Sequence, residues 1–133
     1  MNVKLILEKS ATGYSAYSNE LPGLVTAGEN FEEVIENFNE VLEMQADYLE
    51  ETGKNKEAEE LRNATVSYFL DLETFFDYYS LFNKSELAKY LGINPSHLRR
   101  LSSASVELSE KKALQIKNGL HKLATELQQY NFA

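Results

Sequence analysis

Residues 87–101 read LAKYLGINPSHLRRL, the strongest structural signal in the chain. Ala88 stands four positions before Gly92, a spacing that suits two short helices crossing closely around a sharp glycine turn. Asn94 followed by Pro95 is typical of a capped helix start with proline at the first helical position. The side chains spaced to fill the core between the helices are Leu87, Leu91, Ile93, Leu98 and Leu101. The stretch therefore predicts a helix-turn-helix.

The outward face of the second predicted helix is polar and carries Arg99 and Arg100. Arginine can donate two hydrogen bonds to guanine or bind a phosphate, and Asn, Ser and His reach base edges or backbone oxygens. The predicted DNA-binding residues are Lys84, Ser85, Asn94, Ser96, His97, Arg99, Arg100 and Ser103. Glycine turns and exposed arginines also occur in proteins that bind no DNA. DNA binding is favoured because these features and a locally positive charge coincide in one segment.

The 133-residue chain has a formal charge of −8, but its two parts differ in sign. Residues 1–80 hold 5 Lys and Arg against 17 Asp and Glu, a charge of −12. Residues 81–133 hold 8 against 4, a charge of +4. The first part suits a basic partner, and the second suits a polyanion.

The composition excludes several kinds of site. Because the chain has no cysteine, it can form no disulfide, thiolate nucleophile or cysteine-based zinc site. Two histidines cannot build a His-rich metal centre, so we expect neither a metal nor a cofactor. The sequence has no apolar run long enough to cross a bilayer and no N-terminal secretion signal, which predicts a cytoplasmic protein without a membrane partner.

The N-terminal part begins with strand patterns. Val3, Leu5 and Leu7 alternate with Lys4, Ile6 and Glu8. The stretch 14–18 continues in the same extended style after Gly13, which predicts a β-hairpin. A third strand is predicted at residues 24–27, and a fourth at residues 66–70.

A helix is expected between the third and fourth strands, because Asn30 and Glu33 have the spacing of a capping box. Its inward positions are Phe31, Val34, Ile35, Phe38, Val41, Leu42, Tyr48 and Leu49. The polar segment Glu51–Asn63 contains Gly53 and is predicted to be a loop or a frayed helical turn. The acidic residues Glu32, Glu36, Glu40 and Glu43 fit a solvated helix face better than a magnesium site. We predict no catalytic residues, since strand 3–7 offers no carboxylate and no Ser/His/Asp set exists.

From Leu72 the apolar period changes to that of helices, with Asp71 placed as a cap. We therefore predict an α+β protein with a β-β-β-α-β domain at residues 1–70 and an all-α domain at residues 71–133. A last helix is expected from Ser109, with an inward stripe of Ala113, Ile116, Leu120, Leu123 and Leu127. A group of aromatic residues could be a base-stacking platform or could pack in the core or between the domains. Their neighbours in the sequence are acidic rather than basic, which favours core or interdomain packing. The group comprises Tyr68, Phe69, Phe75, Phe76, Tyr78, Tyr79 and Phe82.

Several N-terminal elements also point to a known family. They are the stretch Lys4 to Glu8, then Gly13-Tyr14-Ser15-Ala16, Glu20-Leu21-Pro22-Gly23, Gly28 and Glu32-Glu33. The order of these elements, followed by an acidic helix, resembles the HicB antitoxins. The resemblance covers nearly the whole chain. It implies a partial ribonuclease-H-like fold up to about Leu70, followed by the helix-turn-helix of one branch of the family. Leu24 stands where cysteine is frequent and Asn30 where threonine is usual, and neither change threatens the fold.

The resemblance implies a partner, HicA, a small basic RNA-cleaving toxin with a double-stranded-RNA-binding-like fold and a catalytic histidine. The acidic N-terminal part would then mask the toxin without any chemistry of its own. Tyr14, Tyr17 and Glu20 are the predicted toxin-binding residues, although ordinary sheet surface explains them equally well. The family also represses its own operon as a dimer on an inverted repeat. A single helix-turn-helix buries too little surface for tight operator binding, so we expect a homodimer or higher homo-oligomer. Its pairing surface is either the last helix or an edge strand.

The alternative is a stand-alone transcriptional regulator whose N-terminal domain senses a ligand or another protein. RNA binding by the N-terminal part is disfavoured by its negative charge.

Overall fold

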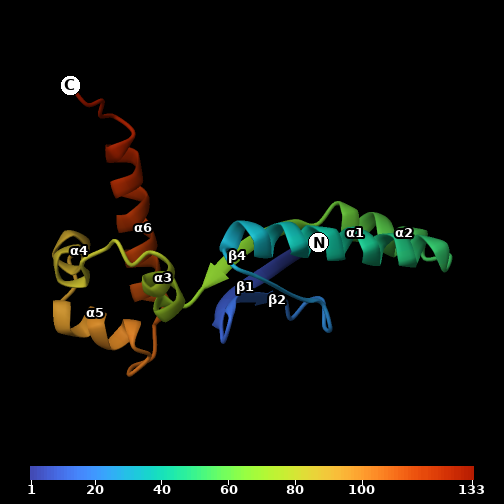
Figure 1. Cartoon of the computed structure of the whole chain (residues 1–133), viewed down its shortest axis with the longest axis horizontal. Coiled ribbons are helices and arrows are strands. Elements are labelled where there is room, and N and C mark those ends of the chain that lie inside the picture. The colour runs from blue at the N-terminus through green and yellow to red at the C-terminus, as the bar shows by residue number, and fades with distance from the viewer. The chain divides into compact units, whose positions relative to one another are not determined.

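The computed structural model describes all residues from 1 to 133 and has an α+β fold with one four-stranded mixed sheet and six helices (Figure 1). In chain order the elements are β1 (Asn2–Ser10), β2 (Gly13–Tyr17), β3 (Val25–Gly28), α1 (Phe31–Glu51), α2 (Asn55–Arg62), β4 (Thr65–Leu70), α3 (Leu72–Tyr78), α4 (Lys84–Leu91), α5 (Pro95–Ser102) and α6 (Glu110–Leu127). The chain divides into two compact units, Met1–Thr74 and Phe75–Ala133. The division falls within α3, slightly after the predicted boundary between residues 70 and 71.

The sheet has the strand order β3-β2-β1-β4, in which β1 pairs antiparallel with β2 and parallel with β4. Strand β3 pairs antiparallel with β2 and forms one edge, while β4 forms the other. The alternation predicted for the first strand is confirmed, because Val3, Leu5 and Leu7 are buried and their neighbours are not.

Helix α1 packs on the buried face of the sheet. Asn30 caps it by accepting a hydrogen bond from the Glu33 backbone N–H at 2.8 Å, as the capping spacing predicts. Val34 and Phe38 are fully buried against the strands. The prediction that Tyr48 faces inward is wrong, since this side chain is exposed where α1 extends past the sheet.

The prediction of a loop or a frayed helical turn at residues 51–63 is also wrong, because residues 55–62 form the regular helix α2. Gly53 adopts a left-handed conformation, with φ of +82°, and reverses the chain after α1. The returning helix buries Ala58 and Leu61 on α1. These two residues supply the apolar contact that stabilises α2. The polar composition of the rest of the segment gives no sign of it.

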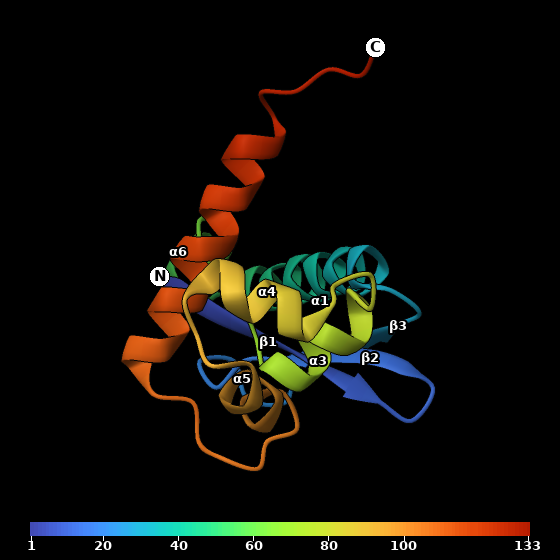
Figure 2. The ribbon, with the colours of Figure 1, turned by 90° about the vertical axis from the view of Figure 1, so that its left-hand side faces the viewer.

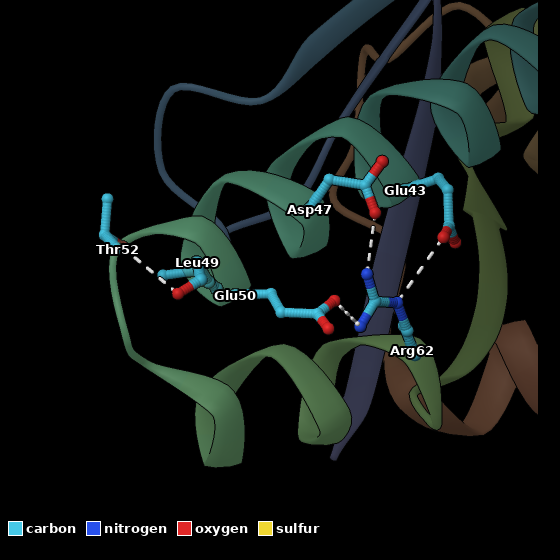
Figure 3. A network of polar contacts seen from close by, with 6 residues as sticks. All are labelled: Glu43, Asp47, Leu49, Glu50, Thr52 and Arg62. Carbon is cyan, nitrogen blue, oxygen red and sulfur yellow. Dashed lines mark hydrogen bonds and ion pairs between the residues drawn. The ribbon is translucent and has the colours of Figure 1, made fainter.

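Arg62, at the end of α2, holds the two helices together through three carboxylates of α1 (Figure 3). Its guanidinium nitrogens lie 2.6 Å from Asp47 Oδ1, 2.9 Å from Glu50 Oε2 and 3.4 Å from Glu43 Oε1. The hydrogen bonds to Asp47 first and Glu50 second raise the pKa of Arg62 above its ordinary value. The acidic face of α1 is therefore partly neutralised from within the unit.

The second unit is built around α4 and α5. Gly92 joins them with φ of +74°, and all five predicted core residues, together with Ala88, are buried. Helix α6 packs on α4, where Gln115 Nε2 donates to the carbonyl oxygens of Leu91 and Gly92 at 3.0 and 3.3 Å. Figure 2 shows these helices together and the end of α6 extending beyond them. The predicted inward stripe of α6 is only partly correct, since Ile116 alone is buried.

The aromatic group does not form a common core. Phe76 is buried, and the Phe75 and Phe82 rings stack at 5.9 Å in the second unit. Tyr68 and Phe69 are exposed on β4, at the edge of the sheet, so the expectation that they belong to a core is wrong for these two.

Candidate functional site

The start of α5 is fixed by its cap. Asn94 Oδ1 accepts hydrogen bonds from the backbone N–H groups of Ser96 and His97, at 2.9 and 3.2 Å. Pro95 occupies the first turn, as predicted. Because Oδ1 of the Asn94 side chain is used by the cap, the NH₂ group of the same side chain is the part that can contact a ligand.

Arg99 links three of the predicted site residues. Its Nη1 donates to Ser85 Oγ of α4 at 2.8 Å, and its Nη2 donates to Ser96 Oγ one turn earlier in α5 at 3.2 Å. These bonds hold an exposed guanidinium in one position on the surface. Arg100 follows on the same helix and is exposed as well.

The remaining predicted residues lie at the margins of this surface. Lys84 Nζ lies 5.4 Å from the Phe76 ring centroid, and His97 is half-buried. Ser103 Oγ donates to the Arg100 carbonyl at 3.2 Å and lies 2.7 Å from Ser105 Oγ. Ser105 was not predicted, because it follows the helix and no periodic pattern marks it.

The charge of this surface is positive. Between residues 81 and 105 the chain holds Lys84, Lys89, Arg99 and Arg100, and its single acidic residue there is Glu86. Glu86 pairs with Lys89 at 3.1 Å. The cations of α5 therefore have no carboxylate within their own helix and can attract an anionic ligand.

A second candidate surface is the face of the sheet opposite α1. The strand registers place Phe69, Ile6, Tyr17 and Val25 side by side in one row across all four strands. Phe69 and Val25 are exposed, and Ile6 and Tyr17 are half-buried. We call this set the sheet row.

Charged side chains border the sheet row. Lys4 Nζ lies 4.5 Å from the Phe69 ring centroid, and the Tyr17 hydroxyl donates to Glu8 Oε1 at 3.5 Å. The row is thus an apolar band with one cation and one carboxylate beside it, a composition common in protein-binding surfaces.

The three predicted toxin-binding residues do not share one face. Tyr14 points toward α1, with its ring 5.0 Å from that of Phe31, whereas Tyr17 lies in the sheet row. Glu20 follows β2 and accepts a hydrogen bond from Ser18 Oγ at 2.6 Å. This hydrogen bond is the main reason that the pKa of Glu20 lies below its ordinary value.

Other kinds of site are missing from the structure. No three His, Cys, Asp or Glu side chains come together in a way that could hold a metal ion. None of the helices is both long and apolar enough to span a membrane.

Comparison with family models, with curated proteins and with solved structures gave no match to this chain. The resemblance to the HicB antitoxins therefore rests on the residues quoted above.

Proposed function

We propose that this protein is an antitoxin that also represses transcription, with one activity in each unit. The observation that carries the proposal is the exposed face of α5, where Arg99 is held by Ser85 and Ser96 beside Arg100. In the proposed function, α4, the Gly92 turn and α5 form a helix-turn-helix, and α5 enters the major groove of operator DNA.

The contacts of Arg99 suit base readout. A guanidinium already fixed by two hydroxyl groups loses little side-chain entropy when its free N–H groups meet a guanine. The Arg100 side chain is exposed beside it and can turn toward the phosphate backbone. Both proposed partners, operator DNA and an RNA-cleaving toxin, belong to the cytoplasm.

For the N-terminal unit, we propose binding of a small basic toxin of the HicA kind, with the unit as a partial ribonuclease-H-like fold. The sheet row supports this proposal, because its apolar side chains lie across all four strands on the face of the sheet that α1 does not cover. An exposed apolar band there favours a protein partner. The charge of −12 on residues 1–80 selects a basic one.

The proposal of toxin binding is tested by co-expressing the full chain with the open reading frame beside its gene, followed by a pull-down and a growth assay. V25D and F69D place a carboxylate in the sheet row, and we expect both to lose the partner and the rescue of growth. M44D is the matched control, since Met44 is 69% exposed, close to the 64% of Val25, but lies on α1. Capture that V25D and F69D leave intact would contradict the sheet row as the binding surface.

Operator binding is tested separately by gel shift with the DNA upstream of the same gene. Sequence-specific binding by a chain that captures no neighbouring protein would favour the stand-alone regulator. Capture and rescue without DNA binding would leave the antitoxin activity and contradict the repressor activity.

A further inference from the structure

Strand β4 forms an unprotected edge of the sheet. It is six residues long and reads TVSYFL, with no charged residue, proline or glycine. Natural edge strands are normally short, charged, interrupted by proline or covered by a helix, because an open edge pairs with other chains. The opposite edge follows this rule, since β3 has only four residues and Asn37 of α1 donates to its Ala27 carbonyl oxygen at 2.8 Å. Strand β4, by contrast, makes extensive contact with β1 alone.

The backbone of β4 points alternately toward β1 and toward the open edge. The Thr65 N–H donates to the Met1 carbonyl oxygen at 2.9 Å, which places the N–H and C=O groups of Thr65 on the β1 side. In a parallel pair both groups of a residue point the same way, and this direction alternates from one residue to the next. The N–H and C=O groups of Val66 and Tyr68 therefore face outward. They are the groups with which a further strand would pair.

Large aromatic side chains lie on both faces of this edge. The register pairs Tyr68 with Leu5, which is buried on the α1 side of the sheet, and Phe69 with Ile6 on the opposite face. Tyr68 and Phe69 are nevertheless 51% and 45% exposed, because β4 has no neighbouring strand on its outer side. A partner docked on one face would reach only one of these rings. An added strand would contact both, because its side chains alternate between the two faces.

We propose that the outer edge of β4 binds an extended segment of the small basic toxin as a fifth strand of the sheet. Recognition by strand addition takes its affinity from main-chain hydrogen bonds and its specificity from the side chains beside them. Here Val66 and Tyr68 supply the main-chain groups, and the rings of Tyr68 and Phe69 supply the side-chain contacts. Phe69 is also one end of the sheet row, so the added strand extends that row. The inference rests on the proposed function, since it states how the proposed toxin is held.

The charge of the first part of the chain favours a basic segment over a second copy of this protein at the edge. Residues 1–80 carry a charge of −12. Two copies joined through β4 would bring two strongly acidic bodies together, and the repulsion between them opposes that pairing. The same charge attracts a basic segment and speeds its association. Charge complementarity therefore selects the toxin as the occupant.

Amide hydrogen exchange measured by NMR tests the inference on the full chain, alone and co-purified with the product of the open reading frame beside its gene. In the chain alone, we expect the Val66 and Tyr68 amides to exchange quickly and the alternate amides of β4, which donate to β1, to exchange slowly. In the complex, we expect exchange at Val66 and Tyr68 to slow at least about tenfold, because an added strand accepts hydrogen bonds from both. This measurement uses no substitution, so it does not depend on how a variant folds.

Proline at position 68 tests the same edge by substitution. Because the Tyr68 N–H points outward, Tyr68→Pro removes no hydrogen bond to β1, and proline is tolerated at such edge positions. Proline cannot donate to an added strand, so we expect Tyr68→Pro to weaken capture of the partner at least about tenfold. Tyr68→Thr is the matched control, because it also removes the ring but keeps the N–H, and we expect it to weaken capture less.

Several results would overturn the inference. A captured partner that leaves exchange at Val66 and Tyr68 unchanged would restrict toxin binding to the sheet row and leave the proposed function standing. Slower exchange of these amides in the chain alone, as its concentration rises, would show that a second copy occupies the edge. Equal losses from Tyr68→Pro and Tyr68→Thr would exclude main-chain pairing at this position. A full chain that captures no partner would contradict the proposed function itself, and the inference with it.

Discussion

The two classes of α5 residue should separate cleanly on substitution. Leu98 is fully buried between α4 and α5, whereas Arg99 and Arg100 lie exposed on the opposite face of the same helix. Replacing Leu98 by alanine should therefore affect folding. Replacing the two arginines should affect DNA binding and leave the fold intact.

The size of the folding effect follows from the burial of Leu98. A buried Leu→Ala change costs about 2–5 kcal/mol, because it removes methyl groups from the core and leaves a cavity. A folded unit of about 60 residues has a stability on the order of 3–9 kcal/mol. Leu98→Ala should thus remove a large share of the stability of the second unit, while the first unit, with its own core, keeps its transition.

The size of the binding effect depends on what each arginine contacts. Loss of a base-reading arginine should weaken operator binding by ~1–3 kcal/mol, which is about 5- to 150-fold. Loss of a phosphate contact should instead reduce the salt slope of the affinity by about one. Because both side chains are exposed, the change in unfolding free energy should stay within about 0.5 kcal/mol.

Thermal unfolding followed by circular dichroism measures the first effect, and gel-shift titrations at several salt concentrations measure the second. If the Arg99→Ala, Arg100→Ala double variant binds its operator with unchanged affinity and unchanged salt dependence, α5 does not read DNA. If Leu98→Ala unfolds like the wild type, the core placement of Leu98 is wrong.

Three further changes test the local structure. Ser18→Ala should raise the pKa of Glu20 toward its ordinary value, which an NMR titration of the carboxyl group measures. Because folding lowers the pKa of Glu20, the hydrogen bond from Ser18 stabilises the protein above the pKa that Glu20 has in the unfolded chain. That stabilisation is lost as the pH falls through the pKa of Glu20 in the folded protein. An unchanged titration would exclude the Ser18 hydroxyl as the main cause. Gly92→Ala should destabilise the second unit by about 1–2 kcal/mol, because alanine is strained at the Gly92 φ of +74°. Steric clash does not contribute, since an added Cβ would meet only Gln115 Nε2, at 3.7 Å. Gly92→Asn should cost less, and equal losses would argue against backbone strain. Arg62→Ala should speed amide exchange in α2 relative to α1, and equal protection in the two helices would show that the buried apolar contacts of α2 suffice.

The α4–α5 pair was predictable because its signals are local. The cap at Asn94, the left-handed turn at Gly92 and the small residue at the crossing are each set by neighbours within a few positions. Backbone rules of this kind hold in almost any surroundings. For the same reason the N-terminal cap of α1 was found at Asn30.

Helix α2 was missed because what stabilises it comes from another part of the chain. Its composition is polar and includes only two apolar positions that pack, Ala58 and Leu61. The carboxylates that hold Arg62 lie on α1, between 12 and 19 positions earlier in the sequence. A single-segment pattern cannot register a contact of that separation, and tertiary packing overrides local preference here.

The two tyrosines assigned to toxin binding illustrate what the sequence could have excluded. Tyr14 and Tyr17 are three positions apart in one strand, and side chains at that spacing point to opposite faces of a sheet. Alternation alone thus rules out a shared contact surface on β2. Alternation does not reveal which side chains lie in the same row as Tyr17. That depends on the parallel pairing of β1 with β4, which places Phe69 next to Ile6 although α1 and α2 separate the two strands in the sequence. The sheet row is therefore a property of topology, and its residues enter the proposal only once the register of all four strands is known.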